Sequence, residues 1–494
     1  MQGTAAWALD APTVAPPSST KHTYSAGVQI IRKRESLSYW RFRLAVKQLH
    51  DVIGKISNIP VGGVNEDLTL TVHDSTLHSG QHEHAMDQPP QPLPLTGPLS
   101  HRWHLKPDVV HLDHGSCGGC PTEVLEYQNA LRRELDAGAH QYFAENYASR
   151  LAVSKKAMGA FLNADPGGLI FTPGSTMGLN IVAQNYKFLP GDEIMTTDHC
   201  YKSVKMLLEY LAERDGAKAV IVKVPFPVAS ADEILETILA ATTPRTKFAI
   251  LDHIVSRTGL VFPIKRIVAE METRGVDVLV DGAHGPGQIA VDLTDLNAPY
   301  YTSSCHKWMC TPRGLGFLHV RADRRSQLKP LVVARSCYFR DTQPGMHTPF
   351  EHRFDWMGTS DPTVVHTVPR IIEFLQTALP GGHAEMVRRN HDLAVEARRA
   401  FIQKLGMEAP CPDDLIANMA TIPLPDSTLP ETMGNLPLQN YLWRKHRVEI
   451  QVYSWPAYPR RTLRFSCQLY NSLEQYEWLA DRVREGLDAE SKQL

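Results

Sequence analysis

The chain has 494 residues, of which 43% are hydrophobic and 21% charged, and its formal net charge at pH 7 is −2. This length allows two or three domains with a large core, and the composition is ordinary for a soluble globular protein. The nearly balanced charge gives no electrostatic reason to expect nucleic acid or an anionic membrane as a partner, and no apolar run reaches the roughly 18 residues that span a bilayer.

The first 95 residues differ in composition from the rest. Residues 1–20 are rich in alanine, proline, serine and threonine, and residues 30–55 combine basic and apolar side chains that could form an amphipathic helix. Histidines and a proline cluster follow, so we expect a disordered or variable extension without a metal site. Acidic residues are scarce before Glu35, which leaves an organellar targeting signal open.

Eight cysteines are spread through the chain. A chain of this length needs no disulfides for stability, so we expect a reducing, cytoplasmic compartment. Cys117 and Cys120 form a lone C-x-x-C motif. Because a zinc site needs a second pair of ligands, we interpret them as ordinary residues of a glycine-rich loop.

Between residues 167 and 320, short apolar runs alternate with amphipathic stretches such as residues 201–213 and 231–241. Continuous apolar strands separated by helices predict an α/β domain whose mostly parallel sheet is covered on both faces. The last run could be an antiparallel strand of the same sheet. The predicted strands are residues 169–171, 193–195, 219–222, 248–251, 276–280 and 314–320.

The C-terminal region predicts a smaller α+β domain. Helices are expected over residues 362–377 and 384–405, short strands over 420–422 and 462–466, and a last helix from Ser472. The predicted organisation is therefore an extension over residues 1–95, a large domain over 96–350 and a small domain over 351–494.

The pair of Asp281 and Lys307 is the strongest chemical signal in the chain. Asp281 ends an apolar run, and Lys307 follows about two dozen residues later on a short polar turn. Such a lysine can hold pyridoxal phosphate as an imine, and the aspartate can pair with the protonated pyridine nitrogen and keep the ring electron-poor. A helix N-cap is the competing interpretation of Asp281.

Ser175 and Thr176 stand where the first predicted strand turns into a helix. Ligands of open α/β sheets bind beyond the carboxyl ends of the strands, and a helix N-terminus with free N–H groups binds anions. We assign this turn to the cofactor phosphate. The alternative is a plain N-cap, which serine and threonine also provide.

Four further side chains follow strand ends. His199 could stack on the pyridine ring and carry protons, although a histidine at a strand end is more often structural. Ser256 could bond the phenolic oxygen of the cofactor, or belong to a plain polar loop. Ala283 is small enough to lie against the ring face, and His284 could contact the ring oxygen.

Residues 110–487 resemble class V aminotransferase-fold, pyridoxal-phosphate-dependent enzymes. The motifs Asp281-Gly282-Ala283-His284 and Ser304-x-His306-Lys307 stand in the order and separation of that family. Within it, residues 111–116, 171–176 and 356–362 resemble the isopenicillin N epimerase-like branch, which includes cysteine C–S lyases.

The resemblance implies fold type I, with seven strands in the large domain, and a homodimer with shared active sites. Lys307 would be the Schiff-base lysine, Asp281 the pyridinium partner and His199 the stacking residue. Thr359 would reach the phosphate of the neighbouring subunit, and Arg464 would bind the substrate carboxylate, which a planar guanidinium suits. A salt bridge is the alternative for Arg464. The resemblance assigns four residues to the phosphate: Ser175, Thr176, Ser304 and His306.

The resulting hypothesis is an enzyme acting at the α-carbon of an amino acid, most simply a C–S lyase for a cysteine-like or cysteine-conjugated substrate. An amino-acid epimerase, or an aminotransferase or decarboxylating variant in natural-product biosynthesis, would need the same lysine. A non-catalytic binding module is a further alternative. Residues 448–461 contain no cysteine, so a persulfide-forming mechanism would need Cys337 or Cys467 to reach the site.

Overall fold

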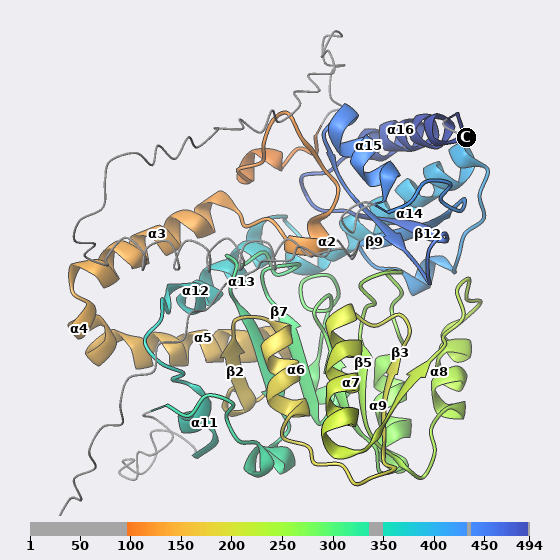
Figure 1. The fold of residues 1–494 in the computed structure, drawn as a ribbon. Helices are drawn as coiled ribbons and strands as arrows, with labels where there is room; N and C mark the ends of the chain where they lie inside the picture. Colours follow the sequence, from red (N-terminus) through yellow and green to blue (C-terminus); the bar gives the residue numbers. More distant parts are fainter. Residues whose placement is uncertain (1–95, 335–348, 432–435, 493–494) are drawn as a thin grey trace, which may run out of the picture. The chain divides into compact units, whose positions relative to one another are not determined.

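The main sheet has seven strands among the described residues, in the order β2-β8-β7-β6-β5-β3-β4 (Figure 1). The computed structural model describes residues 96–334, 349–431 and 436–492, so the expectations for residues 1–95 lie outside it. Strand β8 is antiparallel to both neighbours, and the other pairs are parallel, as predicted. The strands are β2 Leu169–Thr172, β3 Glu193–Thr197, β4 Lys218–Val222, β5 Thr246–Asp252, β6 Asp277–Asp281, β7 Tyr300–Ser304 and β8 Gly316–Val320.

Helices cover both faces of this sheet. In β6, Leu279 packs into one apolar cluster, whereas Val278 and Val280 pack into the other, as strand alternation requires. The first cluster contains α6 and α7, and the second contains α5, α8 and α9. The α/β class predicted from the alternating pattern is therefore confirmed. The helices are α5 Tyr147–Leu162, α6 Ser175–Ala183, α7 Lys202–Asp215, α8 Ala231–Ala240, α9 Ile264–Thr273 and α10 Leu293–Leu296.

The strand β7 was not among the predicted strands. Three of its five residues are Thr302, Ser303 and Ser304, so it lacks the continuous apolar run of its neighbours. All of its residues are buried, and hydrogen bonds compensate the polar side chains. Thr302 donates to the carbonyl of Phe317 and Ser303 to that of Gly282, each over 2.8 Å. Tertiary hydrogen bonding therefore makes this polar sequence a central strand.

A second, antiparallel sheet with the order β11-β12-β9 lies in the C-terminal part. The strands β9 and β12 and the start of the last helix agree with the predictions, whereas β11 was not predicted. Ser472 caps the last helix in a reciprocal capping box with Gln475. The predicted helix over residues 362–377 is divided at Thr367, because Pro369 can only occupy the first turn of a new helix. The elements are β9 Met419–Leu424, β11 Gln451–Ser454, β12 Arg461–Ser466, α12 Thr363–His366, α13 Val368–Thr377, α14 Gly382–Leu405, α15 Pro437–His446 and α16 Leu473–Ser491.

The segment before the main sheet is tied to the C-terminal part. Strand β1 pairs in parallel with β10, so that Val110 lies opposite Val448. All described residues belong to one compact unit over residues 90–494, and the domain boundary at residue 350 stays a prediction. None of the described helices has the length and apolar character that crossing a membrane requires. The remaining elements are η1 Ser100–Arg102, β1 Val110–His111, α2 His114–Cys117, α3 Thr122–Ala137, α4 Ala139–Gln141, η2 Tyr142–Asn146, η3 Pro166–Gly168, η4 Ala322–Gln327, α11 Pro349–Phe354, η6 Asp413–Leu415 and β10 Val448–Glu449.

Candidate active site

A cavity of about 890 Å³ opens beside the carboxyl ends of β5, β6 and β7. Its wall contains most of the residues that the sequence singled out. These are Ser175, Thr176, Ser256, Asp281, Ala283, His284, Ser304, His306 and Lys307. The parallel topology brings these side chains together from positions up to 132 residues apart, because successive strands end at the same edge of the sheet.

Lys307 presents its amine to this cavity. Its Nζ lies 3.0 Å from Nε2 of His284. Burial lowers the pKa of Lys307 to about 8, and the negative charge of Asp281 limits the decrease. About a tenth of the side chain is therefore an uncharged amine at pH 7, far more than for an ordinary lysine, and this is the form that acts as a nucleophile or base.

Asp281 is only 4% exposed at the end of β6 and accepts a 3.0 Å hydrogen bond from the Ala283 amide. Burial raises the pKa of this carboxyl. Asp252 lies opposite it on β5, lines the same cavity and is also 4% exposed. Burial, and then the charge of Asp281, raise the pKa of Asp252 well above its usual value. Sequence analysis did not select Asp252, although its place at the end of an apolar strand was the available signal.

The turn between β2 and α6 forms another part of the cavity wall. Gly174 is the N-cap of α6, so neither Ser175 nor Thr176 is the N-cap residue that the alternative predicted. The Ser175 amide donates to the Ser304 hydroxyl over 3.1 Å, and the two hydroxyls lie 3.0 Å apart. His306 donates from Nδ1 to the Leu315 carbonyl over 3.3 Å. Hydroxyls and a helix N-terminus thus converge on one point, which suits an anion.

His199 does not line the cavity among the described residues. It is fully buried, and its ring nitrogens lie 2.9 Å from the Thr258 hydroxyl and 3.0 Å from the Val224 carbonyl. Trp455 packs against the imidazole with ring centroids 4.6 Å apart. Burial lowers the pKa of His199. Because both nitrogens are engaged, neither is free to carry a proton in this arrangement, whereas the stacking role of His199 stays a prediction. Among the described residues, the tyrosines on the cavity wall are Tyr201 and Tyr453.

Arg464 is fully buried behind the same wall and makes the salt bridge that was the alternative prediction. It donates to Asp113 over 2.9 Å, to the Ser116 hydroxyl over 2.7 Å and to the Ser256 carbonyl. The guanidinium lies over the ring of Tyr453. A substrate carboxylate would therefore compete with Asp113 for this arginine.

Cys117 is a residue whose position the sequence did not predict. It is exposed on the cavity wall at the end of α2. The next residue, Gly118, has φ +65°, and a Cβ there would lie 1.8 Å from the His306 carbonyl oxygen, so glycine is required for this close approach. His114 also bonds the Lys307 carbonyl over 3.0 Å. Two other cysteines were considered for a persulfide-forming mechanism. Of these, Cys467 is buried in the core, and Cys337 lies outside the described residues.

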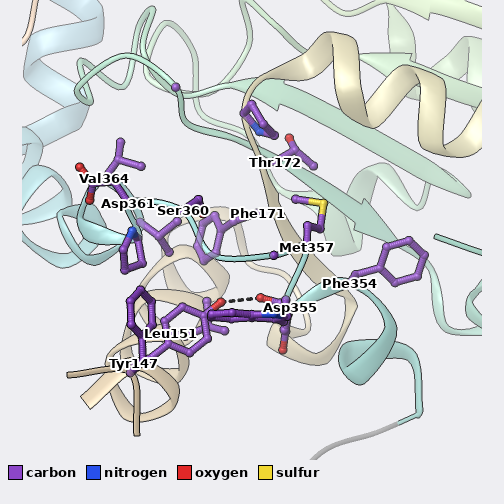
Figure 2. A pocket seen from close by; sticks show the side chains of 17 residues that line it. Tyr147, Leu151, Phe171, Thr172, Phe354, Asp355, Met357, Ser360, Asp361 and Val364 are labelled. Atoms are coloured by element: carbon purple, nitrogen blue, oxygen red, sulfur yellow. Dashed lines mark hydrogen bonds between the residues drawn. The ribbon is translucent and has the colours of Figure 1, made fainter. Parts of the chain in front are cut away.

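Thr359 lies apart from this cavity, exposed on the loop that follows α11. Neighbouring residues of the loop line a smaller pocket of about 120 Å³ (Figure 2). There Trp356 packs against Tyr147, and Pro173 of the β2–α6 turn contributes to the wall. The exposed position is compatible with a contact to another subunit, and that role stays a prediction.

Comparisons with known proteins agree with this geometry. Residues 112–402 match the family described as Aminotransferase class-V. Isopenicillin N epimerase from Amycolatopsis lactamdurans is 31% identical over 397 residues, which cover 77% of this chain and 96% of that protein. A probable chloroplastic L-cysteine desulfhydrase from Arabidopsis thaliana is 29% identical over 405 residues, which cover 77% and 83% of the two chains.

Solved structures share the fold. A mutant of C-DES with glycine covalently linked to its PLP cofactor has a TM-score of 0.66 and 21% identity, over 78% of this chain and 98% of that chain. The cysteine desulfurase CsdA from Escherichia coli has a TM-score of 0.63 and 21% identity, over 79% and 98% of the two chains.

The chain belongs to the class-V aminotransferase family and is a pyridoxal-phosphate-dependent enzyme. Within this family it is similar to isopenicillin N epimerases and L-cysteine desulfhydrases, as its motifs predicted. The cavity fits the cofactor at three points. Lys307 offers an amine, Asp281 offers a buried carboxylate, and the Ser175–Ser304 hydroxyl pair offers an anion site.

Proposed function

We propose that the protein is a C–S lyase that breaks the Cβ–S bond of cysteine or of an S-substituted cysteine. The observation that carries this proposal is the Lys307 amine, which faces the cavity with its pKa lowered to about 8. Relatives described as L-cysteine desulfhydrases support the choice of bond. The bound cofactor supplies an electron sink for the charge left at the α-carbon.

In this proposal the side chains of the chain divide the remaining tasks. Lys307 would attach the cofactor and, once free, would accept the α-proton of the substrate. Asp281 would keep the pyridine nitrogen protonated. Ser256 and His284 would face the ring oxygen, Ala283 would lie against the ring face, and His199 would have a structural role. The phosphate would be held by Ser175, Thr176, Ser304 and His306.

The size of the cavity supports a substrate larger than cysteine. A second cavity of about 660 Å³ shares Ser116, Cys117 and Gln451 with the first. Trp103 and Trp443 line this second space, as do the charged side chains of Arg313 and Glu449. A substituent on the substrate sulfur would have room there, while the amino group stays beside Lys307.

The reaction is tested by product analysis with L-cysteine and S-substituted cysteines. We expect pyruvate, ammonia and sulfide or thiol in equal amounts, and no products from the Lys307→Ala variant. Alanine in place of pyruvate would contradict simple elimination. Cys117→Ser is the matched variant that tests whether a persulfide contributes.

Epimerisation is the second candidate, because the Amycolatopsis relative is an isopenicillin N epimerase. Incubation in deuterium oxide separates the two reactions. Deuterium at the α-carbon of recovered substrate, with loss of optical activity and without sulfide or thiol, would replace the lyase proposal by an epimerase.

We also propose a homodimer in which Thr359 contacts the cofactor phosphate of the neighbouring subunit. Its exposed position away from the cavity of its own chain supports this arrangement. Mixed dimers of Lys307→Ala and Thr359→Ala subunits test it, since one site would then be intact. Recovery of activity on mixing is expected, and no recovery would contradict a contact between subunits.

The free state of seven described cysteines supports a reducing compartment. We propose the cytoplasm, with an organelle as the alternative because one plant relative is described as chloroplastic. Fluorescent fusions of the full chain and of a chain without residues 1–95 test this. A change of compartment on deletion would show that the extension is a targeting signal.

A further inference from the structure

Both ring nitrogens of His284 have a partner. The Trp308 indole Nε1 donates to Nδ1 over 3.2 Å, and Nε2 lies 3.0 Å from the Lys307 Nζ. His284 is only 2% exposed and Trp308 is fully buried, so water does not compete for these bonds.

The chemistry of the donors determines where the protons lie. An indole N–H only donates, so Nδ1 of His284 must be the unprotonated, accepting nitrogen. A neutral imidazole then carries its proton on Nε2 and donates it toward Lys307. An ammonium group has no lone pair to accept that proton, whereas an uncharged amine does. The geometry is therefore self-consistent only with an uncharged Lys307.

We propose that Trp308 is a positioning residue that fixes His284 in the tautomer protonated at Nε2, and that His284 thereby stabilises the uncharged amine of Lys307 relative to the ammonium. The inference concerns the lysine on which the proposed function rests, but it depends only on the amine and not on the reaction catalysed. An uncharged amine is the form that can attack the cofactor aldehyde or accept a proton.

The packing around Trp308 prevents the indole from turning away. Its ring belongs to a small buried cluster with Ile254, Ala417 and Met419. The ring of His114 lies 5.1 Å from it, centroid to centroid. The backbone of Gly287 also packs closely against the backbone of Trp308, because a Cβ at Gly287 would lie only 2.4 Å from the Trp308 carbonyl. The indole N–H is consequently held toward His284.

Other charged groups act on Lys307 in both directions. Burial lowers the pKa of Lys307 to about 8, and the pKa of His284 also lies well below its usual value because of burial and then Lys307. Negative or ionisable groups that favour the ammonium are Asp113, Cys117, Asp252 and Asp281; groups that favour the amine are His306 and Arg464. These charges shift the pKa of Lys307 in opposite directions. The Trp308–His284 bond has a separate effect, because it makes His284 the donor and Lys307 the acceptor of the hydrogen bond between them.

The test replaces Trp308 by phenylalanine, which keeps an aromatic ring but removes the N–H. His284 can then shift its proton to Nδ1 and accept a hydrogen bond from a charged Lys307. We expect the titration midpoint of the Lys307 amine to rise by about one pH unit. About tenfold less of the uncharged amine would then be present near neutral pH. Competitive acetylation of the cofactor-free full chain, read by peptide mass spectrometry, measures this midpoint.

Two matched variants separate positioning from packing. Trp478→Phe, on α16, removes an indole N–H elsewhere and should leave the midpoint unchanged. In a His284→Phe background, Trp308→Phe should add no further shift, because the path through His284 is already broken. Circular dichroism verifies that each variant is folded. An unchanged midpoint in folded Trp308→Phe would overturn the proposal.

A second measurement needs no variant. Nitrogen NMR of histidine-labelled wild-type protein without cofactor reports which nitrogen of His284 is protonated, and we expect Nε2. Protonation of Nδ1 would overturn the proposal. Neither experiment contains an amino-acid substrate, so a failure of the lyase proposal would leave their results unaffected.

Discussion

The two walls of the active-site cavity differ in how the amino-acid sequence encodes them. One wall comes from the ends of β5, β6 and β7 and contains Asp281, Ser304 and Lys307. The other comes from α2 and β11, with Arg464 of β12 buried behind it. The first wall follows from strand order, which short motifs encode. The second depends on contacts such as Asp113 with Arg464, whose positions are 351 residues apart. The residues for the chemistry of the cofactor are therefore easier to predict from sequence than the residues that recognise the substrate.

The largest expected effect tests the first wall. Lys307→Ala should lower the rate of C–S cleavage by about a thousandfold or more, because it removes both the attachment point and the base. Borohydride reduction of the wild-type holoenzyme followed by peptide mapping should place the cofactor on Lys307. A label on another lysine would contradict the assignment of this wall.

The next largest effect is expected from substitutions of the two carboxylates in the first wall, Asp281 and Asp252. Asp281→Asn removes the charge that keeps the pyridine nitrogen protonated and should lower kcat by about 100-fold. Asp252→Asn should have a smaller effect, since Asp252 lies on the neighbouring strand. Steady-state kinetics on both variants measures the difference, and a larger loss for Asp252→Asn would reverse the two roles.

Asp113→Ala tests the second wall. It leaves the buried Arg464 guanidinium without its carboxylate and should lower the free energy of unfolding by about 3 kcal/mol. Urea unfolding measures this change. If Arg464 also binds substrate, Asp113→Asn should lower KM for cysteine and Arg464→Lys should raise it. Unchanged KM in both variants would restrict Arg464 to a structural role.

The pH dependence of the reaction of Lys307 with the cofactor also tests the first wall. Since the pKa of Lys307 is lowered to about 8, the uncharged amine becomes the major form above that pH. The rate of capture by cofactor-free protein should therefore rise about tenfold from pH 7 to 9 and then level off. Stopped-flow absorbance measures the rate. A rate that keeps rising toward the ordinary lysine pKa would show that burial does not act as described.

Cys117→Ser should have the smallest effect, less than about twofold on sulfide release, if the reaction is a simple elimination. Mass spectrometry of the wild-type protein after turnover should then find no additional sulfur on Cys117. A large loss of activity together with a persulfide on Cys117 would give the second wall a role in the chemistry.

The amino-acid sequence by itself determined the α/β class, six of the strands in the main sheet and the motifs that contain Asp281 and Lys307. These features depend on local patterns, namely apolar runs, turns and short motifs. Only the tertiary structure decided that β7 is a strand, that His199 is buried with both ring nitrogens bonded, that Asp113 holds Arg464 and that Trp308 bonds His284. The physical reason is that a buried polar group takes whichever partner the packing brings within hydrogen-bonding distance, and that partner usually belongs to a distant segment of the chain.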